Sequence, residues 1–314
     1  MSRILRRISI VALTFVAIAI IAYLVRNPEK TTLDTAARAG AQGKFVTLSG
    51  GVTHYDVSGP DTGRAVVLVH GASVPYYIWD STAVALSTAG YRVIRYDRYG
   101  FGLSDRPDAL YDSTMFTRQI NDLADSLKLT QFDLMGLSFG GFVTAHYIAS
   151  HADRVRTLTL LDPVAVGRAY PWYMKLPVVH DWFMQTLVVP TAADGQPGDF
   201  FHPEKFPGWA DRFRPQTTYR GIGRAMYRTG LATAGTDYEA MYKVVGKTGI
   251  PVLLVWGKQD PVVAFKNSEM VRGAIPQAEF LPVDSAGHLP AMEQSTLVKA
   301  KMLEFLSAHS GAHP

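Results

Sequence analysis

A serine flanked by glycines stands between an apolar run and a helical pattern. The pentapeptide is Gly136-Leu137-Ser138-Phe139-Gly140, after an expected strand over 132–135 and before an expected helix over 139–151. A serine on so sharp a turn occupies strained backbone, and a glycine two residues away on each side removes Cβ atoms that would collide. The turn also leaves helix N–H groups free beside the serine, where negative charge can develop. This spacing favours a nucleophilic serine over a passive one in a glycine-rich turn.

Two further residues have the types that a serine nucleophile requires. Serine is a weak nucleophile at neutral pH and needs a base such as histidine, which in turn needs an acid to orient it. His288 follows an expected strand over 279–283, and Asp260 follows one over 251–256. Both therefore fall beyond the carboxyl end of a strand, at the edge where open α/β sheets place their sites. Asp162, which follows a third expected strand, is the alternative candidate for the acid.

Strands and helices alternate through most of the chain. The continuous apolar run at 65–69 is typical of a strand buried on both faces, and residues 113–129 have the spacing of an amphipathic helix. This alternation predicts an α/β protein with a mostly parallel central sheet and helices on both faces. The expected strands are 45–48, 52–57, 65–69, 91–96, 132–135, 155–161, 251–256 and 279–283, and the expected helices are 79–88, 113–129, 139–151 and 295–308.

The N-terminus has the composition of a membrane segment. Residues 8–25 carry no charge, and a helix of this length is about 27 Å long, close to the ~30 Å hydrocarbon core of a bilayer. More Lys and Arg precede the run than follow it, which favours a single-pass anchor with the body on the extracytoplasmic side. The alternatives are a buried soluble helix and a signal peptide cleaved after Ala17-Ile18-Ala19, which would leave a secreted or periplasmic protein.

The alternation of strands and helices stops between residues 162 and about 249. Prolines divide this stretch into short segments rich in aromatic residues and Met, and so long an insert is expected to form a cap of short helices. Most of its aromatic side chains, such as Trp172, Tyr173 and Trp209, are expected in a core, and a subset could line an acyl pocket. The predicted organisation is an anchor at 1–26, a polar linker at 27–43, a core at 44–162 and 250–314, and an inserted cap at 163–249.

Composition limits the classes of function. The chain has 314 residues, of which 47% are apolar and 18% charged, so it can form a large core. It has no cysteine, which excludes disulfides, thiolate metal sites and a cysteine nucleophile. Its net charge of +4 comes from four arginines in residues 1–26, and the neutral remainder gives no reason to expect a nucleic-acid partner. No H-E-x-x-H motif supports metal hydrolysis. The oligomeric state is open.

Five sequence blocks together resemble the α/β-hydrolase-fold serine hydrolases, in their esterase and lipase branch. In chain order they are His70-Gly71, DRYGFGLSD at 97–105, GLSFGG at 136–141, GKQD at 257–260 and Gly287-His288. The resemblance implies that Ser138 is the nucleophile, His288 the general base and Asp260 its orienting acid, in the family order Ser, Asp, His. It also implies an oxyanion hole formed by the backbone N–H groups of Ala72 and Phe139. No cofactor and no metal is expected.

Within this family the residues favour hydrolysis of a small-molecule carboxylic ester. Ser138 argues against epoxide hydrolases and haloalkane dehalogenases, which use an aspartate nucleophile. Carbon–carbon bond hydrolases of the meta-cleavage type are an alternative, but they typically have Asn before the serine and Trp after the histidine, where this chain has Leu137 and Leu289. The anchor and aromatic cap suggest a lipophilic ester, in a layout similar to membrane-anchored monoacylglycerol lipases. Perhydrolases without a cofactor and an inactive membrane-tethered binding module are further alternatives.

Overall fold

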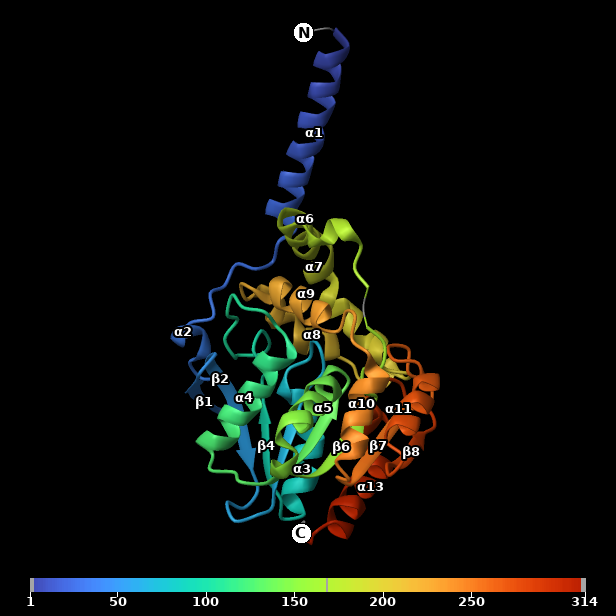
Figure 1. The fold of residues 1–314 in the computed structure, drawn as a ribbon. Helices are drawn as coiled ribbons and strands as arrows, with labels where there is room; N and C mark the ends of the chain where they lie inside the picture. The colour runs from blue at the N-terminus through green and yellow to red at the C-terminus, as the bar shows by residue number, and fades with distance from the viewer. Residues whose placement is uncertain (1–2, 168, 312–314) are drawn as a thin grey trace.

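The body of the protein is built on one eight-stranded sheet, seen in the computed structural model, which describes residues 3–167 and 169–311 (Figure 1). The strand order is β1-β2-β4-β3-β5-β6-β7-β8; β2 is antiparallel to both of its neighbours, and all other neighbouring strands are parallel. The strands are β1 (Lys44–Leu48), β2 (Gly51–Ser58), β3 (Ala65–Val69), β4 (Arg92–Tyr96), β5 (Phe132–Leu137), β6 (Val155–Leu161), β7 (Val252–Gly257) and β8 (Glu279–Val283). The predicted mostly parallel α/β sheet is confirmed.

Helices cover both faces of this sheet. Successive side chains of β3 point to opposite faces of the sheet, and both faces are apolar. Val67 and Val69 pack in the apolar cluster on one face, and Val66 and Leu68 in the cluster on the other. The first cluster contains residues of α4 (Ser113–Ser126), α5 (Phe139–His151), α10 (Tyr238–Lys247) and α11 (Ser268–Ala274). The second contains residues of α3 (Asp80–Thr88), α12 (Pro290–Glu293) and α13 (Ser295–Ala308). Short 3₁₀ turns complete the body: η1 (Tyr76–Trp79), η2 (Ala152–Arg154) and η8 (Phe265–Asn267).

The described residues between β6 and β7 form helices and add no strand to the sheet. They lie at its carboxyl edge (Figure 1). Besides α10, the segment contains η3 (Trp172–Lys175), α6 (Pro177–Phe183), η4 (Met184–Val188), α7 (Val189–Gly195), η5 (Gln196–Asp199), η6 (Pro203–Lys205), α8 (Trp209–Phe213), η7 (Arg214–Thr218) and α9 (Ile222–Ala232). Because α10 packs against α5 and α11, we propose that the cap ends before α10 rather than at residue 249. The other predicted segment boundaries remain proposals.

The N-terminal helix α1 (Arg3–Arg26) extends away from the body beyond the cap (Figure 1). It has 24 residues, a mean hydropathy of 2.8 over its most apolar window, and no buried residue in that window. Its length and composition would allow it to cross a membrane, and a signal sequence would have the same properties.

The linker after α1 lies against the body instead of forming a free tether. It contains the short helix α2 (Thr35–Arg38), and Thr31 forms a β-bridge with Tyr219 near the end of the cap. The Arg38 guanidinium also donates a hydrogen bond to the Leu103 carbonyl in the loop after β4. The polar residues of the linker therefore form specific contacts with the body, which the sequence pattern did not indicate.

Candidate active site

The register of the sheet brings the candidate side chains to one edge. The carboxyl ends of β3 and β5 pair with each other, as do those of β5 with β6, β6 with β7 and β7 with β8. Because these strands are parallel, the residues that follow them meet at the same edge of the sheet. Ser138 follows β5, Asp162 follows β6, and Asp260 and His288 lie in the loops after β7 and β8.

Ser138 occupies a strained turn between β5 and α5. Its φ is 54° and its ψ is −118°, a conformation that non-glycine residues rarely adopt and that is typical of functional sites. A Cβ on Gly136 would lie 2.6 Å from the Gly140 oxygen, and one on Gly140 would lie 2.2 Å from the Val69 oxygen. Both glycines are therefore required for the close approach of backbone that creates the turn.

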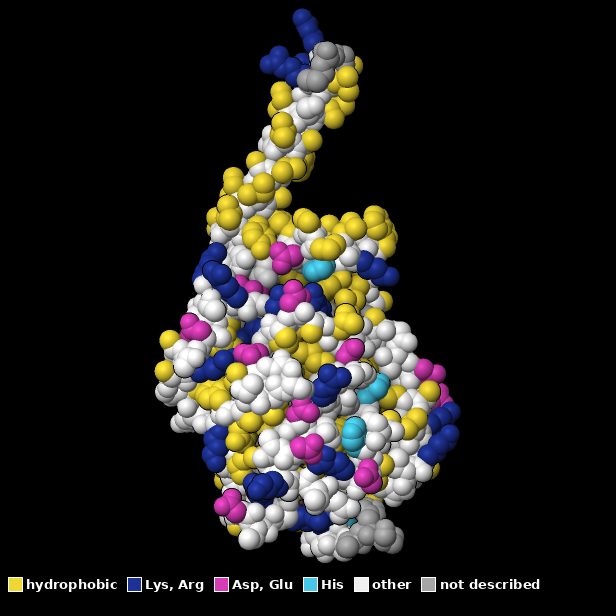
Figure 2. Space-filling view, turned by 60° about the vertical axis from the view of Figure 1, so that its left-hand side comes forward, with side chains coloured by type: hydrophobic (Ala, Val, Ile, Leu, Met, Phe, Trp, Pro, Cys, Tyr) yellow, Lys and Arg dark blue, Asp and Glu magenta, His cyan; other side chains and the backbone are white. Residues whose placement is uncertain are grey.

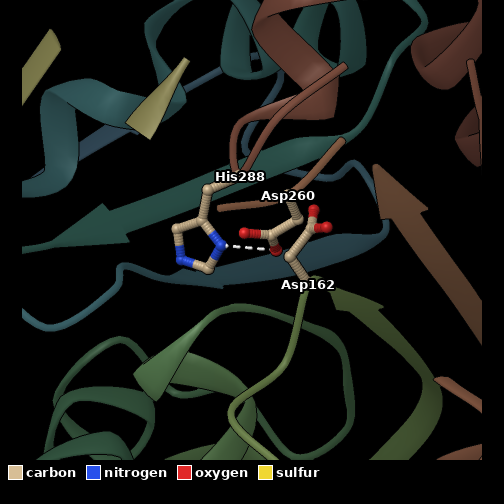
Figure 3. Close-up of side chains that lie close together, drawn as sticks. All are labelled: Asp162, Asp260 and His288. Carbon is tan, nitrogen blue, oxygen red and sulfur yellow. Dashed lines mark hydrogen bonds and ion pairs between the residues drawn. The ribbon is translucent and has the colours of Figure 1, made fainter. Parts of the chain in front are cut away.

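His288 and Asp260 form a buried hydrogen-bonded pair (Figure 3). The distance between Nδ1 of His288 and Oδ2 of Asp260 is 2.8 Å. The other carboxylate oxygen accepts hydrogen bonds from the backbone N–H groups of Val262 and Val263, at 2.7 and 2.9 Å. Burial lowers the pKa of His288, but the hydrogen bond and charge of Asp260, together with the charge of Asp199, outweigh it and raise this pKa above 6.5.

Ser138 and His288 line one small cavity of about 120 Å³. The hydrogen bonds among the described residues do not include one between the Ser138 hydroxyl and the His288 ring. Such bonds are often long in an enzyme without substrate and shorten only in the reacting complex. The structure thus brings the two side chains to one cavity without joining them.

The backbone of Ala72 and Phe139 lies beside Ser138. Both residues line a larger cavity of about 610 Å³ together with the serine. Phe139 is the first residue of α5, so its N–H has no partner within the helix. Neither this N–H nor that of Ala72 donates a hydrogen bond to any other described residue. A Cβ on Gly71 would lie 3.3 Å from Ser138 Cβ, which shows how closely the loop after β3 approaches.

Arg98 holds the loop after β3 in place, a role that the sequence pattern did not predict. It is fully buried, and its guanidinium donates hydrogen bonds to the carbonyls of His70 and Gly71. Its backbone N–H donates to Nε2 of His70, so this histidine also has a structural part. Burial lowers the pKa of Arg98 to about 9. The guanidinium lies over three aromatic rings, those of Phe101, Phe116 and Phe139.

Asp162 lies next to Asp260, on the side away from His288, and the histidine is hydrogen-bonded to Asp260 instead (Figure 3). It has a positive φ of 41°, and one carboxyl oxygen accepts a hydrogen bond from the Gly257 N–H at 2.8 Å. The other oxygen has no partner among the described residues. Burial, and then the charge of Asp260, raise the pKa of Asp162 well above 3.8. Burial and the neighbouring carboxylate thus both favour the protonated form of Asp162.

The same three residues have donor atoms of the kind that bind metals. One such atom from each of Asp162, Asp260 and His288 lies within 4.8 Å of the others. However, Nδ1 of His288 is already hydrogen-bonded to Asp260, and a metal at this position would have to replace that bond. The raised pKa of Asp162 also works against a cation ligand, because a ligating carboxyl must lose its proton. The donor set fits proton transfer better, and we propose no metal here.

A segment of the cap packs on the histidine loop. The backbone N–H of His288 donates a 2.8 Å hydrogen bond to the carbonyl of Asp199, the last residue of η5. Glu293, at the end of α12, links the same two segments. Its carboxylate accepts hydrogen bonds from the backbone N–H groups of Gly287, Phe201 and His202. No sequence motif pointed to Asp199 or Glu293, because contacts between distant loops leave no local pattern.

The larger cavity extends from Ser138 into the cap. Its cap wall is mostly apolar and comes from η3, α6, η4 and α9, including Met174, Phe183, Met184, Val188 and Met226. Binding sites for small organic molecules commonly combine such walls with a few polar groups, which Ser138 and Thr229 supply here. The expected cap core is only partly correct: Trp209 is buried, whereas Trp172 and Tyr173 are exposed.

A helix-covered, mostly parallel sheet with a strained serine and a His–Asp pair at its carboxyl edge defines the class of α/β hydrolases. The sequence pattern of the alpha/beta hydrolase fold matches residues 64–295, so the chain belongs to this family and the expected resemblance is confirmed.

Similar proteins include several kinds of hydrolase. The chain is 24% identical to an uncharacterized carboxylesterase of Bacillus subtilis (strain 168), over 85% of this chain and 87% of the relative. It is 25% identical to Lipase 3 of Moraxella sp. (strain TA144), over 86% of each chain. A meta-cleavage product hydrolase from Pseudomonas fluorescens IP01 has a TM-score of 0.72 at 22% identity, over 85% of this chain and 98% of that chain, and shows the shared fold.

Proposed function

We propose that this protein hydrolyses a carboxylic ester through an acyl-enzyme on Ser138. The observation that carries the proposal is a strained serine that shares one cavity with a buried His288–Asp260 pair. Ser138 Oγ attacks the ester carbonyl while Nε2 of His288 accepts its proton, and Asp260 orients the ring and stabilises its charged form. His288 then gives the proton to the leaving alcohol and activates the water that releases the acid.

The backbone N–H groups of Ala72 and Phe139 serve in this proposal as the oxyanion hole. Both lie beside Ser138 and have no partner among the described residues, so they are free to donate to the oxygen of a tetrahedral intermediate. Loss of one such donor typically costs about 3 kcal/mol of transition-state stabilisation. In this view Arg98, which holds the loop that contains Gly71, is a positioning residue for one of the two donors.

The surroundings of the site favour an ester over a carbon–carbon bond substrate. Leu137 and Leu289 line the small cavity with Ser138, where an amide or indole N–H would be expected for a meta-cleavage substrate. The apolar cap wall of the larger cavity fits an acyl chain or another lipophilic group. The carboxylesterase and lipase names among the relatives agree with this choice.

We also propose that α1 is retained as a single membrane anchor, with the catalytic body on the extracytoplasmic side. The support is a set of contacts between α1 and the cap. The Trp182 indole N–H donates to the Ala19 carbonyl at 2.8 Å, and the Tyr23 hydroxyl lies 3.0 Å from an oxygen of Asp181. A signal peptide destined for removal would have no need of such contacts with the folded body.

The decisive test is covalent labelling of Ser138 with a fluorophosphonate, followed by a substrate screen. We expect labelling of the native chain and none of Ser138→Ala, because the probe needs an activated serine. The screen compares p-nitrophenyl esters of increasing chain length, monoacylglycerols and one meta-cleavage product. Preference for the meta-cleavage product would overturn the ester assignment, and a folded but unlabelled native chain would favour a binding module.

A further inference from the structure

We propose that one apolar face of the cap docks on the lipid bilayer beside α1, and that the active-site cavity takes a lipid-dissolved acyl ester from that bilayer. This docking face is defined by Trp172, Tyr173, Leu176, Val178, Phe183 and Leu187. The docking rests on the proposed anchoring of α1, and the substrate source rests on the proposed esterase activity. The two parts are therefore tested separately below.

The docking face is unusually apolar for a protein surface. Its six side chains lie within the 16 residues 172–187, in η3, α6 and η4 and at Leu176 between η3 and α6. All six are exposed, with Trp172 75% and Val178 82% accessible. Within 172–187, all of which the structure describes, the only exposed charged residues are Lys175 and Asp181. Figure 2 shows hydrophobic side chains gathered on the top of the body where α1 leaves it. Contiguous apolar surfaces of this kind mark interaction sites.

The contacts with α1 place this face at membrane depth. Trp182 of α6 bonds to the carbonyl of Ala19, and Arg26 at the end of α1 donates to the Thr186 carbonyl of η4. Ala19 precedes Arg26 by seven residues, which corresponds to about 10 Å along the helix. Ala19 also belongs to the uncharged run at 8–25. A bilayer that covers this whole run must therefore reach α6, and η4 lies next to its edge, at Arg26.

The residue types around this contact suit the interface of a bilayer. Trp172, Tyr173, Trp182 and Tyr23 have apolar rings with one polar group, and such rings concentrate at the boundary between hydrocarbon and water. Lys175 offers a positive charge to lipid phosphate groups while its aliphatic stem stays on the apolar surface. The carboxylate of Asp181 accepts a hydrogen bond from the hydroxyl of Tyr23. These properties favour lipid over a second protein as the occupant of the docking face.

The docking face and the wall of the active-site cavity belong to the same short helices. Phe183 takes part in both, and its neighbours Met184 and Val188 line the cavity, as does Met174 of η3. An ester held in the outer part of the leaflet would thus meet the cavity wall directly. The substrate class that follows is a long-chain acyl ester that partitions into membranes, rather than a water-soluble one.

The depth of the docking face can be measured because the chain has no cysteine. Single cysteines at Trp172 and Val178 would carry a nitroxide label in the full chain, reconstituted in phosphatidylcholine vesicles. Labels at Val84 and Leu297, which are exposed on α3 and α13, are matched controls. We expect the first two labels to collide more with oxygen and less with a water-soluble nickel chelate than the controls.

Two results would overturn the docking. One is equal nickel accessibility at all four labels, which would place the face in water. The other is protection of the Trp172 and Val178 labels from both oxygen and nickel, which would indicate a contact between copies of the chain. Neither result depends on catalysis, so loss of Ser138 labelling with the expected label depths would refute only the proposed esterase.

The source of the substrate is tested with charges on the docking face. Trp172→Asp/Val178→Asp changes two exposed side chains that do not line the cavity, and Val84→Asp is the control. We expect the double variant to keep its rate on a soluble short-chain ester and to lose roughly tenfold on a long-chain ester in vesicles, because burial of each apolar side chain favours docking. An equal rate of native and variant chains on the vesicle substrate would overturn the bilayer route.

Discussion

Two carboxyl groups of similar burial have different tasks beside His288. Asp260 accepts hydrogen bonds from the ring and from two backbone N–H groups, whereas Asp162 accepts one within the described part of the chain, from the Gly257 N–H. Two ionised carboxylates this close would repel each other, and this repulsion, together with burial, raises the pKa of Asp162 and favours its neutral form. In the proposed reaction, the Asp260 carboxylate would then stabilise the protonated His288 that forms when Ser138 attacks the ester.

The pH dependence of kcat/KM should report the raised pKa of His288. The ring must be neutral to accept the serine proton, so activity should fall as the pH drops through this pKa, which lies above 6.5. Asp260→Asn removes the two largest interactions that raise the pKa of His288; burial, which lowers this pKa, and the smaller raising effect of Asp199 remain. We expect this variant to lose about three to four orders of magnitude in kcat. The fall of its remaining activity at low pH (the acid limb of the profile) should move to a lower pH than in the native chain. Stopped-flow rates across a pH series would measure both.

Asp162→Asn is the matched control for Asp260→Asn in the pH experiment. The Asn oxygen can still accept the hydrogen bond from Gly257, and its amide is uncharged, like the protonated form of Asp162 that burial favours. We therefore expect kcat within about threefold of the native value and an unmoved acid limb. A larger loss in Asp162→Asn than in Asp260→Asn would reassign the triad acid to Asp162.

At the scale of elements, the site depends on contacts between segments that are far apart in the chain. The loop after β3 is held by Arg98, and the loop after β8 by Glu293 and by the carbonyl of Asp199. Glu293 is the most informative of these, because one carboxylate binds the cap segment and the histidine loop together. Movement of this cap segment should therefore shift the loop that contains His288.

Glu293→Gln tests this link between the cap and the histidine loop. Its amide group can accept hydrogen bonds through one atom only, so at least one of the three N–H groups loses its partner. We expect the free energy of unfolding to fall by about 1–2 kcal/mol and kcat/KM to fall about tenfold. Urea denaturation and ester kinetics would measure the two effects.

A surface carboxylate supplies the control for Glu293. Glu304 on α13 is exposed, and Lys301 is its one ion-pair partner among the described residues. Glu304→Gln should therefore change stability by less than about 0.5 kcal/mol and leave kinetics unchanged. If Glu293→Gln behaves like Glu304→Gln, the contact has no part in holding His288.

At the scale of the whole molecule, the segment between the proposed anchor and the body is fixed to the cap by specific hydrogen bonds. The carboxylate of Glu29 accepts hydrogen bonds from the backbone N–H groups of Gly221 and Gly223, at the start of α9, and from the Gln185 side chain. Free N–H groups and the dipole at a helix N-terminus favour such a negative charge. Glu29 thus ties α9 and η4 to the chain that leaves the proposed membrane anchor.

Truncation should separate the anchor from this linker. A chain that begins at residue 27 keeps Glu29, and we expect it to be soluble and active on short esters. A chain that begins at residue 44 loses the contacts of Glu29, and its free energy of unfolding should be lower by roughly 2 kcal/mol. Denaturant titration of the two chains would compare them. Equal stability would mean that the linker is only a tether.

Local patterns determined the fold class and the positions of the candidate site residues. Apolar runs mark strands buried on both faces, and the glycines at 136 and 140 indicate the turn that the structure contains at Ser138. The expected strand over 132–135 was two residues short, because pairing of β5 with β6 continues to Leu137. Local sequence is sufficient for these features because each depends on neighbours within a few residues.

Only the tertiary structure decided which side chains meet. Asp162 and Asp260 both follow buried strands, so their spacing could not show which one contacts His288. Arg98 and Glu293 act on loops distant in sequence, and no local pattern records such partners. The proline-rich cap has no long helical period, so its aromatic residues could not be divided into core and surface. The reason is that these contacts depend on how separate elements pack, which is a property of the whole chain.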